Sequence, residues 1–542
     1  MTKLKLLIVG PVLLLLASAV QAQKFRSDDP IWEDPDRKPI PSPATIDDVS
    51  MVVDFLSNTF AHRPDDRVPG AENINTLGEV PDSSWFTNRM TMRALSSADL
   101  VKGPNSRQGP DMSKPWVIVR GKTQGITPGF TIVDGRGDTY FIKFDPPGYA
   151  QLATSAEVIS TKFFHAFGYN VPEYYLARIR RENVTIGTDA KLTDENGRKR
   201  KWTEKDVDRI FKRVAVQEDG TVQVVASLKV DGTVIGPFKY YGTRSDDPND
   251  IFPHEHRREL RGLRLFAAWL NHDDSRSLNT LDSYIQEGES GYVKHHLSDF
   301  GSCLGSGSVR IQGRRAGNEY MLEWGPILKA ALSFGAWDRS WRYVDYPRYP
   351  SIGRFEADYF KPERWRPEYP NPAFERMQNE DAFWACRTIA RFTNEAVRAI
   401  VKTGELRDPE AEEYLINCLI KRRDKIVRHY LARMNPLSDF QIATKEAQNV
   451  LRFCNLGEEA GVGKAESYQY QWSSYDNGSG ATKSLGAVEV VATPELPMPG
   501  ESATGYLAVV IRTLSPDQKD WKKGVTVYLA PSPLRVVGVE RE

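Results

Sequence analysis

Two short polar runs carry the side chains that are best suited to chemistry. The first contains Asp274 and, five residues later, Asn279; the second begins at Asp299 and continues with Phe300 and Gly301. Phosphoryl transfer needs a carboxylate that orients or deprotonates the attacking hydroxyl, and an amide oxygen plus a second carboxylate that hold Mg²⁺ against the phosphates. Two strand-like segments around a polar, glycine-bearing turn separate the runs. They predict a hairpin, whose ends must lie side by side.

These runs resemble the protein-kinase-like superfamily. His272, Asp274 and Asn279 match its H-x-D-x-x-x-x-N catalytic loop, and the Asp-Phe-Gly run at Asp299 matches its D-F-G motif. The resemblance spans roughly residues 115–435 at the level of motifs. It implies that Asp274 is the catalytic base and that Asn279 and Asp299 are ligands of Mg²⁺.

Upstream, three strand-like segments and a glycine-spaced loop suit the binding of a nucleotide. Glycines let backbone N–H groups approach phosphate oxygens, and a lysine supplies a point charge for them. The family has the same order, with a glycine loop before a third-strand lysine, and Lys143 fills that position. The resemblance therefore implies that Gly121, Thr123, Gln124, Gly125 and Lys143 bind the nucleotide. The glycines do not follow G-x-G-x-x-G, and a plain surface hairpin is the alternative.

An apolar stripe over residues 153–167 predicts a helix that ends at Gly168. Glu157 lies in this helix, where the family's glutamate pairs with the strand lysine. The resemblance thus implies an ion pair between Glu157 and Lys143, with a solvated helix glutamate as the alternative. The end of the helix, Gly-Tyr-Asn-Val-Pro-Glu, is similar to atypical members of the superfamily, of the HipA type or kinase-like proteins of the secretory pathway.

The first residues are typical of a secretory signal peptide. Lys3 and Lys5 precede an apolar run over residues 6–20, and a small-residue cleavage site ends at Ala22. The run is short for a spanning helix, and no comparable stretch follows. We therefore expect a periplasmic or secreted protein without a membrane span after cleavage; an uncleaved anchor is the alternative.

The composition argues against nucleic acid and zinc as binding partners. The 542 residues include 72 basic and 72 acidic side chains, so the basic excess of a general nucleic-acid binder is lacking. The four cysteines are widely spaced and form no C-x-x-C, which makes a zinc site improbable. Export permits disulfides, but the pairing of these cysteines cannot be deduced, and buried thiols fit equally well.

The pattern along the chain predicts an α+β protein with a two-lobed kinase-like fold, an antiparallel β N-lobe and a helical C-lobe, followed by an all-β module. An apolar series that starts after Thr45 predicts an amphipathic helix in the N-terminal segment. Two long helices are predicted at about 381–402 and 409–434. The expected divisions are a signal peptide (1–22), an arm and helix (23–114), an N-lobe with an insertion after residue 178 (115–250), a C-lobe (251–460) and a β-sandwich-like module (465–542).

Taken together, the resemblance implies an exported, Mg²⁺-dependent phosphotransferase that uses ATP or another nucleotide on an unknown envelope or extracellular acceptor. Two alternatives stay open. One is a non-catalytic, pseudokinase-like scaffold that binds a ligand or an envelope protein, because no ATP pool is expected outside the cytoplasm. The other is nucleotidyl transfer on the same fold.

Overall fold

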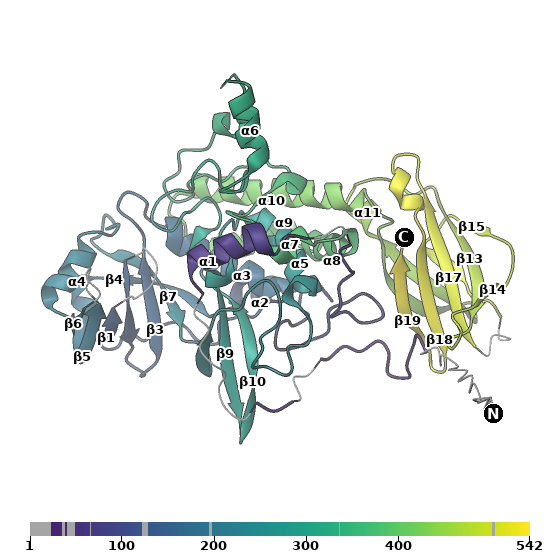
Figure 1. Cartoon of the computed structure of the whole chain (residues 1–542), viewed down its shortest axis with the longest axis horizontal. Helices are drawn as coiled ribbons and strands as arrows, with labels where there is room; N and C mark the ends of the chain where they lie inside the picture. The colour runs from purple at the N-terminus through teal and green to yellow at the C-terminus, as the bar shows by residue number, and fades with distance from the viewer. Residues whose placement is uncertain are drawn as a thin grey trace, which may run out of the picture.

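The computed structural model describes residues 23–34, 38–40, 49–64, 67–121, 128–193, 198–334, 336–500 and 505–542. A β-rich lobe, a helical lobe and an all-β module follow one another along its longest axis (Figure 1). The predicted α+β fold, with two lobes and a C-terminal all-β module, is confirmed. The predicted signal peptide, the helix start at Thr45, and Thr123, Gln124 and Gly125 lie outside the described residues.

The N-lobe is built on a seven-stranded sheet in the order β4-β7-β3-β2-β1-β5-β6. The strands are β1 Trp116–Gly121, β2 Gly129–Val133, β3 Thr139–Phe144, β4 Tyr174–Ile179, β5 Val184–Thr193, β6 Lys199–Lys201 and β7 Val222–Leu228. The predicted insertion is in fact part of this sheet, since β7 lies between β3 and β4 and β5 extends the β1 edge. The sequence predicted an antiparallel sheet. The structure has a mixed sheet, because β5 runs parallel to β1 while the other strand pairs are antiparallel.

One helix, α3 (Leu152–Phe167), lies between this sheet and the helical lobe. Its first turn is held by Asp145, whose carboxylate accepts the N–H groups of Gln151, Ala153 and Thr154. It ends at Gly168 as predicted, and φ is 122° there, a conformation that favours glycine. Fifteen of its sixteen residues are buried.

The C-lobe consists mainly of α5 (Arg258–Leu270), α8 (Asn379–Ala390), α9 (Asn394–Lys402) and α10 (Pro409–Leu431), with the short α7 (Pro372–Glu375) beside α5. The predicted helix 381–402 is two helices. The first ends at Ala390, and the Thr393 side chain accepts the N–H of Ala396 as the N-cap of the second helix. Gly262 of α5 lets this helix approach Trp384, because a Cβ would come within 2.8 Å of that ring.

A hairpin of β9 (Thr280–Glu287) and β10 (Ser290–Leu297) projects beneath the helices, as predicted, and β8 (Thr233–Gly236) pairs with β9. Four further helices lie around the two lobes: α1 (Met51–Leu56), which a π-helical turn Ser57–Ala61 continues, α2 (Ser97–Lys102), α4 (Glu204–Phe211) and α6 (Trp324–Leu332). Short 3₁₀ turns occupy Arg181–Asn183, His254–His256, Ser277–Asn279, Phe300–Ser302, Ser340–Tyr343, Pro362–Arg364 and Lys519–Lys522.

The all-β module starts at Leu437, earlier than the predicted boundary at residue 465. Strands β11 and β12 belong to it, because Leu437, Leu451 and Phe453 share one core with the strands that follow. Its elements are β11 Leu437–Lys445, β12 Gln448–Asn455, α11 Leu456–Glu459, β13 Ser467–Tyr475, β14 Thr482–Ser484, β15 Glu489–Val491, β16 Glu495–Pro497, β17 Tyr506–Leu514, β18 Val525–Pro531 and β19 Leu534–Arg541.

The structure distinguishes between the two alternatives for the cysteines, disulfides or free thiols. All four are free: Cys303, Cys386 and Cys418 are buried, and Cys454 is half-buried. They are therefore thiols inside the fold. In the part of the chain that the structure describes, no helix is long and apolar enough to span a bilayer.

Candidate active site

Lys143 is the centre of a charge cluster that joins three elements. It points from β3, and its Nζ lies 3.2 Å from Glu157 Oε1 on α3 and 2.9 Å from Asp299 Oδ1 after β10. The predicted ion pair between Lys143 and Glu157 is thus present. Burial alone would lower the pKa of Lys143, but the carboxylates of Asp299 and Glu157 outweigh burial and raise it. The ammonium is therefore charged throughout the physiological range.

Glu157 connects this lysine to the Asp-Phe-Gly turn. Its carboxylate is buried, and Oε1 also accepts the N–H of Phe300 at 3.0 Å. Burial raises the pKa of Glu157, while Lys143 opposes that rise. Gly301 leaves room for the carboxylate, because a Cβ there would lie 2.9 Å from Glu157 Oε2. The glycine of the motif therefore has a packing reason.

The Asp299 side chain lies on a turn that buried neighbouring residues hold in place. Asp299 has φ 58°, in the left-handed region, and its N–H donates to the Tyr174 hydroxyl at 3.3 Å. The next residue, Phe300, is fully buried and stacks on Phe164 with ring centroids 4.6 Å apart. The Asp299 side chain itself is 48% exposed. The turn thus combines a buried aromatic anchor with an accessible carboxylate.

The loop after α5 begins with a buried histidine. The His272 ring packs beside the stacked rings of Phe164 and Phe300, and its centroid lies 5.7 Å from each of theirs. Burial lowers the pKa of His272 to about 4. At neutral pH this histidine is uncharged, and its contacts make it a packing residue that connects the loop to α3.

Asp274 and its neighbour Asp273 have different partners. Asp274 Oδ1 forms an ion pair with Arg276 Nε at 2.7 Å, and burial raises the pKa of Asp274 to about 7. Asp273 Oδ1 instead accepts the side-chain N–H of Gln312 at 2.8 Å. Asp273 is thereby held by the segment that follows the Asp-Phe-Gly turn, whereas Asp274 is paired with the guanidinium of Arg276.

The hairpin brings the two ends of the motif pair together. Leu297 pairs with Thr280, and the N–H of Ser298 donates to the backbone oxygen of Asn279 at 2.9 Å. Asn279 and Asp299 therefore start from adjacent chain positions. Asn279 Nδ2 donates to the backbone oxygen of Asp274 at 2.7 Å, which joins the predicted base to the predicted metal ligands.

The donor set suits Mg²⁺. Mg²⁺ prefers oxygen ligands and is held by one or two carboxylates together with water and substrate phosphates. The Asn279 amide and the Asp299 carboxylate carry oxygen atoms of this kind. Within the described residues no cluster of three or more His, Cys, Asp or Glu side chains could hold a metal alone, as zinc and calcium sites require.

One predicted nucleotide contact has a different explanation. Gly121 ends β1 and is buried, and a Cβ at this position would come within 3.0 Å of Leu192 and 3.1 Å of Trp202. The absence of a side chain at Gly121 is therefore needed for its packing against Leu192 and Trp202. The other glycine-loop residues lie outside the description.

The sequence analysis missed Arg276, which bridges Asp274 and Glu368, its Nη1 lying 2.7 Å from Glu368 Oε2. It also missed Tyr174, whose hydroxyl accepts from Asp299. A basic residue two positions after the candidate base is a signal that could have identified Arg276. Tyr174 is brought in by the pairing of β4 with β7, which no local pattern reveals.

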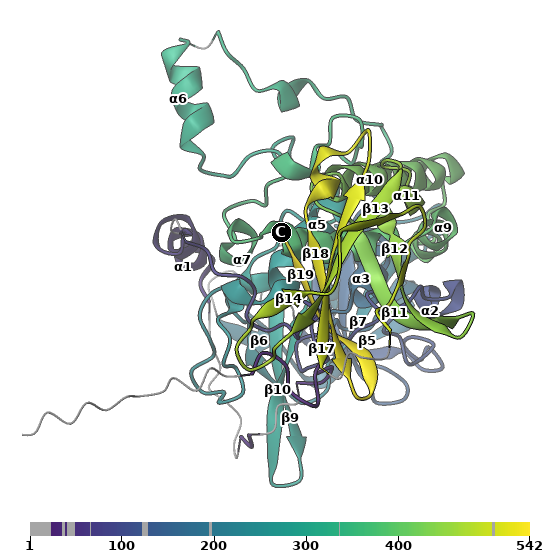
Figure 2. The ribbon, with the colours of Figure 1, turned by 90° about the vertical axis from the view of Figure 1, so that its right-hand side faces the viewer.

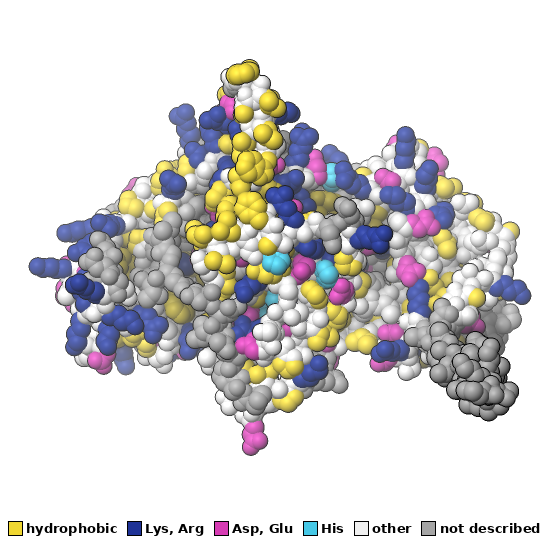
Figure 3. All heavy atoms as spheres, viewed as in Figure 1, with side chains coloured by type: hydrophobic (Ala, Val, Ile, Leu, Met, Phe, Trp, Pro, Cys, Tyr) yellow, Lys and Arg dark blue, Asp and Glu magenta, His cyan; other side chains and the backbone are white. Residues whose placement is uncertain are grey.

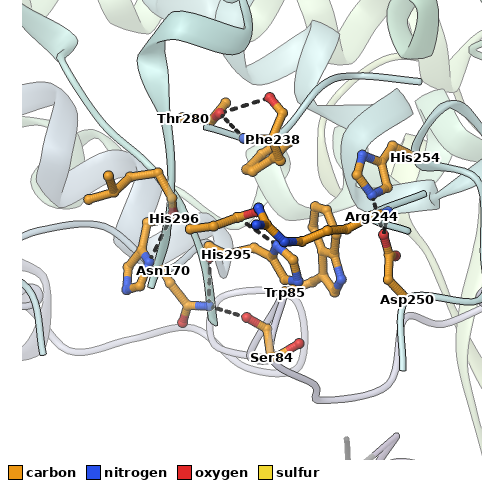
Figure 4. Close-up of polar contacts among 12 residues, drawn as sticks. Ser84, Trp85, Asn170, Phe238, Arg244, Asp250, His254, Thr280, His295 and His296 are labelled. Carbon is orange, nitrogen blue, oxygen red and sulfur yellow. Dashed lines mark hydrogen bonds and ion pairs between the residues drawn. The ribbon is translucent and has the colours of Figure 1, made fainter. Parts of the chain in front are cut away.

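A second polar cluster fixes the base of the hairpin (Figure 4). Trp85 stacks on His295, with ring centroids 3.6 Å apart, and both residues are buried. The ring of His295 bonds to Asp282 at 2.7 Å, and the ring of His254 bonds to Asp250 at 2.7 Å. The imidazoles of His254 and His295 thus each have a carboxylate partner.

Three side-chain hydrogen bonds to backbone oxygens complete this cluster. Asn170 donates from its amide to the backbone oxygens of Ser84 and His295, and the Thr280 hydroxyl donates to Phe238. These bonds attach the hairpin to the end of α3 and to the N-terminal segment (Figure 4). They hold the hairpin ends, and with them Asn279 and Asp299, in register with the lobe above.

Comparison with known proteins gives little. No family model matches the chain. No curated protein matches it either. Among solved structures, the chain is similar to the crystal structure of a Helicobacter pylori proinflammatory kinase, CtkA, with 15% identity and a TM-score of 0.32 over 59% of this chain and 96% of that one. A similarity at this level carries no functional argument, which must come from the geometry of the site.

Proposed function

We propose that this protein is an atypical kinase-like phosphotransferase. One observation carries the proposal: Lys143 is held by Glu157 on one side and by Asp299 on the other, and these residues come from β3, α3 and the turn after β10. Kinases require both a lysine–glutamate pair and an aspartate of the Asp-Phe-Gly motif in place. A surface hairpin or a solvated helix would have no need for such a cluster.

The roles follow from chemistry and position. Lys143 binds phosphate oxygens of the nucleotide, and Glu157 positions Lys143. Asn279 and Asp299 would hold Mg²⁺, which neutralises charge on the phosphates when it is bound. Asp274 accepts the proton of the attacking hydroxyl, and its pKa near neutrality suits a base that works near pH 7.

In the transfer step, the acceptor oxygen forms a bond to the terminal phosphorus of the nucleotide. The bond from that phosphorus to the bridging oxygen breaks, and the nucleoside diphosphate leaves with the electron pair. The acceptor proton passes to Asp274. We propose an exported enzyme that acts on an envelope or extracellular acceptor, since the sequence predicts a cleavable leader before Gln23.

The test is nucleotide titration of the mature protein with and without Mg²⁺. Asp299→Asn should weaken Mg²⁺-dependent ATP binding by about tenfold or more, because a charge at the metal is lost. Asp274→Asn should bind ATP nearly as the parent does, but should not transfer phosphate. Asp189→Asn, an exposed residue of β5, is the matched control and should change neither property.

Two outcomes would contradict this function. Equal, metal-independent ATP binding by the parent and both site variants would favour a non-catalytic scaffold. Formation of pyrophosphate together with a nucleotide-modified acceptor would favour nucleotidyl transfer. Mass spectrometry of the acceptor distinguishes nucleotidyl transfer from phosphotransfer, because the acceptor gains the mass of a nucleotide in the first case and of a phosphate in the second.

A further inference from the structure

Helix α6 projects from the molecule and has no buried residue (Figure 2). Its apolar side chains instead face solvent, and two residues near its end are the extreme cases. Leu332 is 80% exposed and Phe334 is 99% exposed. Such residues in a folded protein indicate a surface that meets something other than water.

The projection is folded and not a loose loop. The buried Glu319 forms an ion pair with Arg339 Nε at 2.8 Å and accepts the indole N–H of Trp341 at 3.1 Å. At its base, Gly317 pairs with Arg366. These ordered contacts therefore hold an apolar helix away from the core.

Helix α1 lies on the same face and is turned in an unusual way. Asp54 is its buried residue, while Val52, Val53 and Leu56 are exposed. The Asp54 carboxylate accepts the Ser277 hydroxyl at 2.8 Å and the Tyr369 hydroxyl at 2.7 Å. The sequence predicted an amphipathic helix here. Ser277 and Tyr369 hold the acidic side chain of this helix, and the apolar residues Val52, Val53 and Leu56 face outward.

The two apolar helices form one surface. In Figure 2 both protrude on the side that faces the viewer in Figure 1, and Figure 3 shows apolar side chains from α6 down to α1, with Lys and Arg side chains around them. Residues 310–348 contain seven basic and four acidic side chains, although the whole chain is neutral. The exposed basic residues of this segment are Arg310, Arg314, Lys329, Arg342 and Arg348. We call this apolar face with its basic rim the α1–α6 surface.

We propose that the α1–α6 surface docks on an anionic lipid bilayer. A helix end that carries Leu and Phe beyond Trp and Lys has the composition of an element that lies in the membrane interface. A basic rim is attracted to anionic headgroups. A bilayer accepts a projecting apolar tip without a matching cavity, whereas a protein partner would need one.

Docking would also hold the candidate active site at the bilayer. α1 bonds to Ser277 of the catalytic loop, and the base of the projection reaches Arg276 through Glu368. The membrane inference itself rests on exposure and charge, and it does not depend on the proposed phosphotransfer.

The experiment measures binding of the mature full chain to vesicles of phosphatidylcholine, with or without phosphatidylglycerol, by co-sedimentation. We expect binding to the anionic vesicles and a loss of about tenfold in the double variant Leu332→Ser/Phe334→Ser, because the apolar tip is removed. Binding of the parent should weaken at high salt, about 0.5 M, where charge attraction is screened.

The matched control is Val488→Ser/Val490→Ser, which changes two exposed apolar residues of the β module. It should bind vesicles as the parent does. No binding of the parent to anionic vesicles, or equal loss in both double variants, would overturn the proposal. The parent could instead form a dimer that Leu332→Ser/Phe334→Ser abolishes, and bind no vesicles. That result would assign the α1–α6 surface to a second copy of the chain and would also overturn the proposal. Unchanged unfolding midpoints establish that both variants fold.

Discussion

Helices α3 and α6 are both rich in apolar residues, but α3 is buried and carries Glu157 of the candidate active site, whereas α6 is exposed on a projection. In α3 fifteen of sixteen residues are buried, and in α6 none is. The two helices cannot be told apart by their apolar content. The difference lies in what surrounds them: a sheet and a helical lobe enclose α3, whereas α6 is carried out on a projection.

The polar groups of the two helices show the same contrast. The polar side chains of α3 are used inside the protein: Ser155 donates to the backbone oxygen of Gly404 at 2.7 Å, and Glu157 binds Lys143. The one charged residue of α6, Lys329, is exposed. A buried helix must satisfy each polar group, while an exposed one leaves this to water. The comparison therefore separates a helix that builds a site from one that presents a surface.

The largest effect is expected in the core of α3. Phe163 is fully buried and packs against Trp269 and Phe392. Phe163→Ala should lower the free energy of unfolding by about 3–5 kcal/mol, because it removes a large ring and leaves a cavity. Urea unfolding followed by circular dichroism measures this. A loss below 1 kcal/mol would show that α3 is packed as loosely as α6.

A smaller effect is expected at the charge of α3. Glu157→Gln keeps the size of the side chain but removes its charge beside Lys143, and it should cost about 2 kcal/mol of stability. It should also weaken ATP binding, since Lys143 would then pair with Asp299 alone. Isothermal titration measures the second effect. The exposed Glu289→Gln serves as control, and equal ATP affinity in both variants would argue against a positioning role for Glu157.

The smallest effect is expected in α6. Leu332→Ala should change the free energy of unfolding by no more than about 0.5 kcal/mol, because an exposed side chain loses few contacts. The same urea experiment as for Phe163→Ala measures it. A loss of 2 kcal/mol or more would mean that α6 packs against the body of the protein in solution, and the contrast with α3 would disappear.

The sequence could predict those parts of the site that depend on local order. Lys143 and Glu157 lie on a strand and the helix that follows it, and their contact is set by that short connection. The position of Asn279 next to Ser298 follows from the hairpin register, which alternating residues and a short turn determine. The combination of two motifs with a hairpin was therefore enough to predict that the chain positions of Asn279 and Asp299 lie close together.

Other features could not be predicted from local patterns. Periodicity shows that one face of α1 is apolar, but not whether protein covers it, and here Ser277 and Tyr369 hold the opposite face. The break before α9 depends on one capping threonine, Thr393, in an otherwise helical run. The packing reason for Gly121 depends on Trp202, far along the chain.

The N-terminal arm has a consequence for the timing of folding. Phe25 is buried among Tyr475, Tyr506 and Tyr528 of the β module, and Lys24 forms an ion pair with Glu540 at 2.6 Å. The ribosome makes the arm first and the strands that enclose Phe25 last. The arm therefore has no strand to pack against until almost the whole chain has been synthesised. Its contact with the β module, which closes a loop of about 500 residues, is a late event in folding.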